Sequence, residues 1–311
     1  MNQQILYLFK RLIWFSLLAF LGYAVFLYLF ASFIPQKNIP NLIYLQDHNY
    51  LRLKEAKQMS NVDLLFLGSS HAYRSFDTRI FTASNYKAFN LGSSSQTPKQ
   101  TLILLKRYLK QLNPKLVVFE VNPILFTSDG VESAIDLITS DNNDINSLKM
   151  VVDQKNVKVL NTYLYALANS IFKKSPDIKL KTYHKGGYVS RANLKYYDGE
   201  KPIDEKIIIK EKQLKAFKAI IVMLESNNID YILVQAPVTQ QKYRSFTNMA
   251  EFNAKLKAYG DYYDFNNKLK LIDTLDFYDN HHLNQSGVTI FNTAFLELLE
   301  KEYNHIKGSL K

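Results

Sequence analysis

Short apolar runs that alternate with helical patterns are the feature that most constrains the fold of this chain. The runs are largely apolar and cover residues 62–67, 86–91, 116–121, 229–235 and 262–265. Helical periodicity follows them over residues 97–112, 204–227, 249–258 and 285–302. Apolar strands of this kind are buried on both faces of a sheet. The alternation therefore predicts an α/β fold with a parallel sheet and helices on both of its faces.

A second feature is the long apolar segment near the N-terminus. Residues 12–34 carry no charge, whereas Lys10 and Arg11 precede them and Pro35 follows. As a helix, the segment would be roughly 34 Å long, enough to cross a hydrocarbon core of about 30 Å. A cleaved signal peptide is the alternative, but the run is long for one and no small-residue cleavage site follows. We expect a single-pass membrane protein with residues 1–11 in the cytoplasm and the C-terminal domain outside it.

The remaining segments differ in composition. Residues 35–60 are polar with scattered aromatic residues and are interpreted as a stalk. The alternating pattern covers residues 61–303, and residues 304–311 are interpreted as a tail. Residues 124–203 interrupt the pattern with a polar stretch rich in Lys, Tyr and Asn, which predicts an insertion after the third strand. Within it, residues 183–202 are expected to form a solvated hairpin, with glycan binding as the alternative.

Composition excludes several functional classes. The net charge is +11, but the lysines are scattered and often lie beside acidic residues, so we expect no nucleic-acid partner. The absence of cysteine excludes disulfides and thiolate metal sites. The chain has no P-loop, no G-x-G-x-x-G and no G-x-S-x-G, and we expect no cofactor.

Polar residues follow three of the predicted strands. They are Gly68-Ser69-Ser70-His71, Asn90 to Ser95, and Glu120-Val121-Asn122-Pro123. The carboxyl ends of parallel strands meet at one edge of a sheet, where sites of α/β proteins form. A fourth polar segment, residues 279–287, precedes the last helical pattern.

This fourth segment contains an aspartate and a histidine at positions i and i+3, Asp279 and His282. In that spacing the carboxylate can orient the imidazole, whose far nitrogen then removes a proton from a serine. Serine and histidine should lie about 2.6–3.2 Å apart. The alternative is that these residues only form a turn and a helix cap at the surface.

Together, the four segments resemble the SGNH (GDSL-type) hydrolase superfamily over residues 61–303, apart from the insertion. The matching positions are Gly68-Ser69-Ser70 for its Gly-Asp-Ser block, Asn90-Leu91-Gly92 and Asn122 for its second and third blocks, and Asp279-x-x-His282 for its last. The resemblance implies a flavodoxin-like three-layer α/β/α fold. It also implies that Ser70 is the nucleophile, with His282 as its base and Asp279 as the orienting carboxylate. The oxyanion donors would be the N–H groups of Ser70 and Gly92 and the side-chain amide of Asn122.

The sequence departs from the family pattern at several positions. Ser69 replaces an aspartate, His71 a leucine and Ser95 a second glycine, while Glu120 and Pro123 replace the glycine and aspartate of the third block. With the N-terminal anchor, these changes resemble the cell-envelope branch of the superfamily. That branch includes the anchored protein of lipoteichoic acid D-alanylation and the alginate O-acetylation proteins, which work beside a membrane-bound O-acyltransferase.

The resemblance therefore implies a membrane-anchored serine esterase or O-acyltransferase. It would act through an acyl-serine intermediate on acyl groups of a cell-envelope or exported polysaccharide. Expected partners are an acylated carbohydrate or envelope glycan and a membrane-bound O-acyltransferase. The altered first and third blocks leave open a catalytically inactive module that binds a glycan or the acyltransferase.

Three further residues are expected to line the pocket, His71, Glu120 and His281. Histidine and carboxylate suit zinc, but no strong metal-binding spacing is present, and we expect no metal. A carboxylate beside an oxyanion hole would oppose catalysis, so we expect Glu120 to be paired or turned away.

Overall fold

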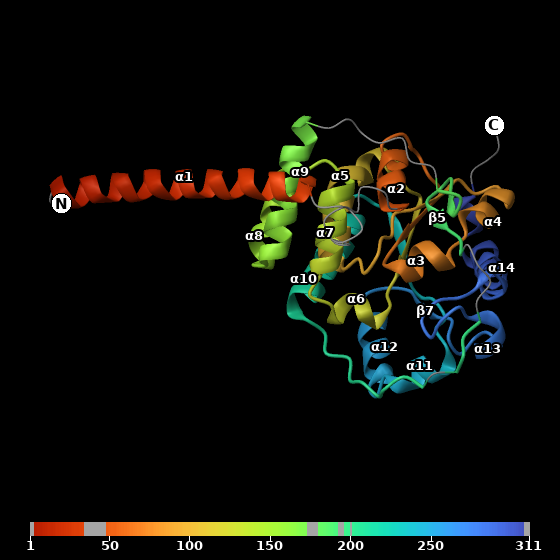
Figure 1. The fold of residues 1–311 in the computed structure, drawn as a ribbon. Coiled ribbons are helices and arrows are strands. Elements are labelled where there is room, and N and C mark those ends of the chain that lie inside the picture. The colour runs from red at the N-terminus through yellow and green to blue at the C-terminus, as the bar shows by residue number, and fades with distance from the viewer. Residues whose placement is uncertain (1–2, 34–47, 173–179, 192–195, 200, 308–311) are drawn as a thin grey trace.

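The computed structural model describes residues 3–33, 48–172, 180–191, 196–199 and 201–307. It consists of a globular α/β domain and one long helix, α1 (Gln3–Phe33), that projects from the side of the domain (Figure 1). The helix begins nine residues before the predicted segment, because residues 3–11 continue its regular backbone. Residue 34 lies outside the described residues.

The centre of the domain is a parallel sheet of five strands. They are β1 (Leu64–Leu67), β2 (Ala88–Asn90), β3 (Leu116–Glu120), β6 (Asp230–Gln235) and β7 (Tyr262–Asp264). Their order in the sheet is β2-β1-β3-β6-β7, and every neighbouring pair is parallel. This is the flavodoxin-like order, whose topological switch point lies between β1 and β3. The predicted fold class is confirmed.

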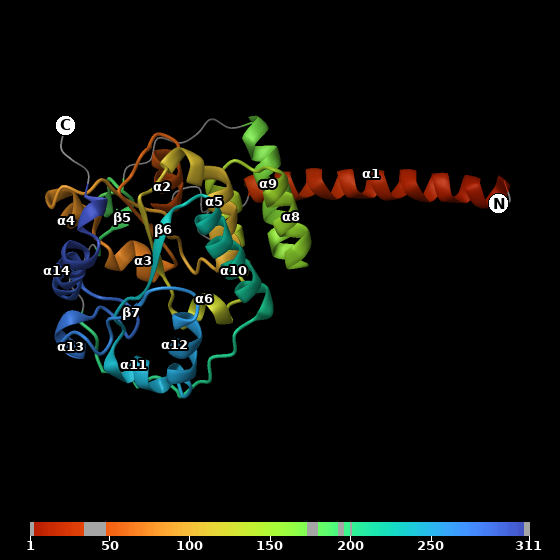
Figure 2. The ribbon, with the colours of Figure 1, turned by 180° about the vertical axis from the view of Figure 1, so that it is seen from behind.

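Helices cover both faces of the sheet, as the apolar strands require. One face carries α5 (Pro98–Leu112), α10 (Glu211–Ser226) and α12 (Met249–Lys257), of which α5 and α10 lie side by side in Figure 2. The other carries α3 (Ser70–Ser75), α4 (Thr78–Ala83) and α14 (Gln285–Glu302). Within β1, Leu65 and Leu67 pack in the first layer, and Leu64 and Phe66 pack in the second.

The predicted insertion lies between β3 and α10. It contains α6 (Pro123–Thr127), α7 (Val131–Ser140), α8 (Ile145–Gln154), α9 (Val157–Phe172) and a hairpin of β4 (Tyr183–His184) and β5 (Tyr188–Val189). The expectation that this hairpin is solvated is wrong, because Tyr188 and Val189 are buried. The Gly186 carbonyl accepts a 2.7 Å hydrogen bond from the N–H of Asn90, so the hairpin packs against the end of β2.

The ends of the domain also differ from expectation. Residues 35–47 of the predicted stalk lie outside the described residues, but α2 (His48–Ala56) is part of the domain, with Leu53 and Ala56 fully buried in the core. The predicted tail begins with a 3-10 helix (Asn304–Ile306), whose Ile306 is buried. The remaining helices are α11 (Gln240–Ser245) and α13 (Asp273–Asp276).

The predicted helix over residues 204–227 begins only at Glu211. The residues before it run alongside another segment instead: Glu205 pairs with Phe246, and the N–H of Ile207 donates to Asn248 Oδ1 at 2.8 Å. These contacts hold the chain in an extended form that a helix would break.

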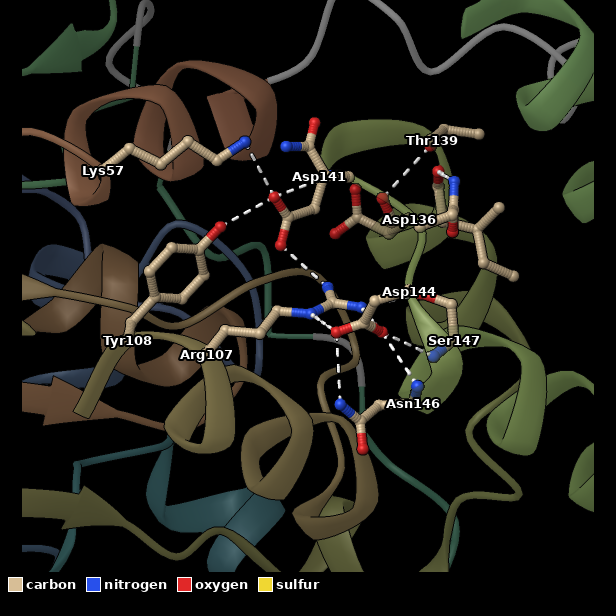
Figure 3. A network of polar contacts seen from close by, with 12 residues as sticks. Lys57, Arg107, Tyr108, Asp136, Thr139, Asp141, Asp144, Asn146 and Ser147 are labelled. Atoms are coloured by element: carbon tan, nitrogen blue, oxygen red, sulfur yellow. Dashed lines mark hydrogen bonds and ion pairs between the residues drawn. The ribbon is translucent and has the colours of Figure 1, made fainter. Parts of the chain in front are cut away.

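A partly buried polar network joins the insertion to the rest of the domain (Figure 3). Arg107 of α5 binds Asp141 at 2.8 Å and Asp144 at 2.7 Å. The hydroxyl of Tyr108 donates to Asp141 at 2.7 Å, and Lys57 lies 2.9 Å from the same carboxylate. Asp144 also caps α8 by accepting from two backbone N–H groups of its first turn. One guanidinium thus fixes both the end of α7 and the start of α8.

Replacement of Arg107 tests this role. Arg107→Ala should lower the free energy of unfolding by about 3 kcal/mol, because it leaves the buried carboxylate of Asp141 without its main partner. The measurement is urea unfolding in detergent, followed by circular dichroism. Lys110→Ala, an exposed position on the same helix, is the control and should change stability by less than about 0.5 kcal/mol. Equal stability of the two variants would contradict the assignment.

Candidate active site

The turn between β1 and α3 presents the two serines. Gly68 has φ +139°, and a Cβ there would lie 2.9 Å from Cβ of Glu120 and 3.1 Å from Cβ of Ala72. Only glycine therefore allows the chain to turn this close to β3. Ser69 caps α3, and Ser70 is the first residue of the helix. The nucleophile candidate thus lies at the carboxyl end of β1, beside the switch point of the sheet.

The structure brings Ser70, His282 and Asp279 together in one hydrogen-bonded chain. Ser70 Oγ lies 2.8 Å from His282 Nε2, within the range expected from the sequence. His282 Nδ1 lies 2.9 Å from Asp279 Oδ1 and 3.0 Å from Oδ2. Asp279 Oδ1 also accepts the backbone N–H groups of His281 and His282, at 2.9 and 2.8 Å. Asp279 therefore fixes both the turn and the orientation of the His282 ring.

Burial and hydrogen bonding have opposite effects on the pKa values of Asp279 and His282. Burial alone would raise the pKa of Asp279, but hydrogen bonds from His282 and the backbone hold it well below its usual range. Burial lowers the pKa of His282 by more than Asp279 raises it, and Arg191 and Arg74 lower it further. At neutral pH the aspartate is ionised and the imidazole is neutral, which is the state that can accept a proton from Ser70.

Two of the three predicted oxyanion donors have no hydrogen-bond acceptor among the described residues, although Asn122 Nδ2 is shielded from solvent. The Ser70 N–H lies in the first turn of α3, where amides have no acceptor within the helix. Asn122 is fully buried, and its Oδ1 accepts from the N–H of Ile124 at 3.1 Å. That bond fixes the amide and leaves Nδ2 without a hydrogen-bond partner among the described residues.

Gly92 differs from the other two predicted donors. Its N–H donates to Asn90 Oδ1 at 3.0 Å and is therefore occupied. A Cβ at this position would lie 2.9 Å from the Ser69 carbonyl oxygen and 3.0 Å from Cβ of Ala72. Gly92 is thus needed for close packing against the turn that carries Ser70.

Two of the three expected pocket residues, His71 and His281, lie beside this hydrogen-bonded chain. The ring of His71 stacks on that of His282 with centroids 5.2 Å apart, and the ring of His281 lies 5.9 Å from that of His71. Burial is the main cause of two pKa shifts. It lowers the pKa of His71 well below the ordinary value, and it lowers the pKa of His281 to about 4. Both rings are therefore neutral at neutral pH. Within the described part of the chain, no group of three or more His, Asp or Glu residues is arranged to hold a metal ion.

Among the described residues, Glu120 lacks the partner that was one of its two expected arrangements. It is fully buried behind Gly68, and no described residue makes a hydrogen bond of ordinary geometry with either carboxyl oxygen. Burial raises its pKa well above the ordinary value, by more than the nearby backbone of Ala236 and Asn122 lowers it. Glu120 is therefore buried and unpaired among the described residues. Burial favours its protonated form, which places no negative charge beside the candidate site.

Two arginines near Ser70, His282 and Asp279 are not among the residues predicted from the sequence. Arg191, which follows the inserted hairpin, lies 3.4 Å from Asp279 Oδ2 and 3.9 Å from the ring centroid of Tyr278. Arg74 lies one helical turn after Ser70, and that spacing was a signal available in the sequence. No local pattern points from Arg191 to Asp279, which lies 88 residues further along the chain.

Comparisons with known proteins give weak likenesses. No family model and no curated protein matches the chain. Among solved structures, a Bacteroides fragilis protein assigned as an acylhydrolase shares 13% identity and a TM-score of 0.44, covering 83% of this chain and 98% of its own. A GDSL-like lipase of Bacteroides thetaiotaomicron shares 14% identity and a TM-score of 0.44, and the match covers 82% of this chain and 98% of the lipase. A Streptococcus pneumoniae protein described as a platelet activating factor shares 10% identity and a TM-score of 0.47, and the match covers 85% of this chain and 97% of that protein. These values are too low to carry a functional argument.

The protonated state of Glu120 has a consequence for stability. Between about pH 4.5 and the raised pKa, the unfolded chain loses the Glu120 proton and the folded chain keeps it, so stability falls as pH rises. Glu120→Gln cannot ionise in either state and should be more stable than the parent at neutral pH, by about 1.4 kcal/mol for each pH unit over which the folded parent keeps a proton that the unfolded chain has lost. The gain should vanish in acid. Urea unfolding at both pH values measures it.

Glu297→Gln, at an exposed position of α14, is the matched control and should show no such pH-dependent gain. If Glu120→Gln is less stable than the parent at neutral pH, the carboxyl is ionised and the neutral assignment is wrong.

Proposed function

We propose that this chain is a membrane-anchored serine esterase or O-acyltransferase that acts on acyl groups of a cell-envelope or exported polysaccharide. The observation that carries the proposal is the continuous chain from Ser70 through His282 to Asp279, with contacts of 2.8 and 2.9 Å. These three hydrogen-bonded residues lie where strands β1 and β3 end, and such edges of α/β sheets are the usual location of active sites.

The first half of the reaction follows from this geometry. Ser70 Oγ attacks the ester carbonyl carbon, and its proton passes to His282 Nε2. Asp279 stabilises the imidazolium that forms. The tetrahedral intermediate then collapses, the bond to the leaving alcohol breaks, and His282 returns the proton to that alcohol. The product is an acyl ester on Ser70.

Negative charge develops on the carbonyl oxygen during this step. The N–H of Ser70 and Nδ2 of Asn122 are the donors available to it, and each such donor is worth about 10²–10³ in rate. Asn122 suits this role because its fixed, buried amide has a donor with no other partner among the described residues.

In the second half, His282 removes a proton from the acceptor hydroxyl, which attacks acyl-Ser70 and releases the serine. Water as acceptor gives hydrolysis, and a sugar hydroxyl gives transfer. The acyl donor would be supplied by a membrane-bound O-acyltransferase, or an acylated carbohydrate would be the substrate itself. The first of these roles would place the protein beside a membrane.

The helix α1 supports that location. Residues Gln3–Phe30 form the one helix in the described part of the chain that is long and apolar enough to cross a membrane. With Lys10 and Arg11 retained on the cytoplasmic side, the α/β domain would lie outside the cytoplasm.

A second candidate is a catalytically inactive module of the same fold that binds a glycan or the acyltransferase. One observation favours it: the N–H of Gly92 is engaged by Asn90, so the site has fewer oxyanion donors than the resemblance implies.

Hydrolysis of a nitrophenyl acetate ester separates the two candidates. Ser70→Ala and His282→Ala should each lower kcat/KM by at least about 10³, because each removes a member of the proton-transfer chain. Ser69→Ala is the matched control and should keep most of the activity, since its hydroxyl only caps α3 and contacts His71. No activity in the parent, or equal activity of Ser70→Ala and the parent, would leave only the inactive module.

A further inference from the structure

Two helices of the insertion carry apolar side chains on their outer face. In α8 these are Ile145, Leu148 and Val152, and in α9 they are Val157, Leu160, Leu164, Leu167 and Ile171. We call this set the outer stripe. Successive members within each helix are three or four residues apart, so they share one face. Val152, Val157 and Ile171 are 64%, 65% and 77% exposed. Exposed apolar side chains gathered on one helix face mark an interaction site.

Helices α8 and α9, which carry the outer stripe, lie on the side of the domain from which α1 projects (Figure 1). The hydroxyl of Tyr23 in α1 donates to Asn161 of α9 at 2.7 Å, and the rings of Tyr28 and Tyr165 lie 5.9 Å apart. Both views show α9 running across α1 rather than along it (Figures 1 and 2). If α1 crosses a membrane, α9 therefore runs along the membrane plane.

The position of this crossing sets the depth of α9. Tyr23 is twelve residues after Arg11, a distance of about 18 Å along the helix. With Arg11 at the inner boundary of a hydrocarbon core about 30 Å thick, Tyr23 lies roughly 12 Å below the outer boundary. Amphipathic helices at membrane interfaces are immersed by about 5–10 Å, a similar depth. The contact with α1 thus draws α9 into the outer leaflet.

We infer that α8 and α9 form a membrane-embedded platform, with the outer stripe among the acyl chains of the outer leaflet. The inference rests on the proposed anchoring by α1. Lys149, Lys155 and Lys158 are exposed beside the stripe, and lysines in this setting bind anionic lipid headgroups. Two attachments, α1 and the platform, fix the orientation of the domain. They hold the carboxyl edge of the sheet at a constant height above the bilayer.

The native tryptophan content allows a direct test. Trp14, in α1, is the only tryptophan of the chain. In the full-length protein with Trp14→Phe, a tryptophan is introduced as Leu167→Trp or Ile171→Trp in the outer stripe. Each variant is reconstituted in vesicles of phosphatidylcholine and phosphatidylglycerol with or without brominated acyl chains. Both tryptophans should lose fluorescence in brominated vesicles to an extent comparable with Trp14 of the parent.

Ile290→Trp, at an exposed position of α14 on the far side of the domain, is the control and should keep its fluorescence. Quenching of Trp14 without quenching at positions 167 and 171 would overturn the platform alone and favour a protein partner for the stripe. Absence of quenching at Trp14 would overturn the anchoring and the platform together. Equal quenching at position 290 would show unspecific adhesion and also overturn the platform.

Discussion

The parallel pairing of β1 with β2 and β3 is the constraint on which the core and the candidate site both depend. Phe66 is in register with Asn90 of β2 and Val118 of β3, so the three strands end at one edge of the sheet. The turn after β1 can then pass close to β3 only because Gly68 has no side chain. The stacked rings of Phe66 and Phe76, with centroids 4.5 Å apart, hold α3 on the sheet and fix the direction in which Ser70 points.

Desolvation gives the site an unusual balance of charge. It favours the neutral forms of His71, His282 and Glu120, and only Asp279 keeps its charge, because hydrogen bonds offset the effect of its burial. The proposed reaction would therefore start from an uncharged serine–imidazole pair. Asp279 would stabilise the imidazolium, and the amide of Asn122 would stabilise the oxyanion.

Local patterns in the sequence were sufficient for much of this site. Asp279 and His282 were recognisable from their i, i+3 spacing, and Ser70 and Asn122 from their positions after buried strands. The engagement of the Gly92 N–H by the Asn90 side chain could not be predicted, because it depends on a rotamer. The neutral state of Glu120 depends on burial by distant segments.

The insertion shows a second limit of sequence analysis. Arg191 reaches Asp279 only because the hairpin before it packs on β2. Outside the insertion, α2 likewise packs on the core with one face although its sequence is polar. Neither packing leaves a periodic signal, since both depend on contacts between segments far apart in the chain. The outer stripe has such a signal, at positions 157, 160, 164, 167 and 171, but only the structure shows that this face is exposed.

The central claim is that Ser70 is a nucleophile activated by His282. The most direct measurement is to treat the protein with a fluorophosphonate and to locate the covalent adduct by mass spectrometry. The account predicts an adduct on Ser70 that is lost in His282→Ala, because the neutral imidazole is needed to remove the serine proton. An adduct on another residue only, or labelling of Ser70 that persists in His282→Ala, would contradict it.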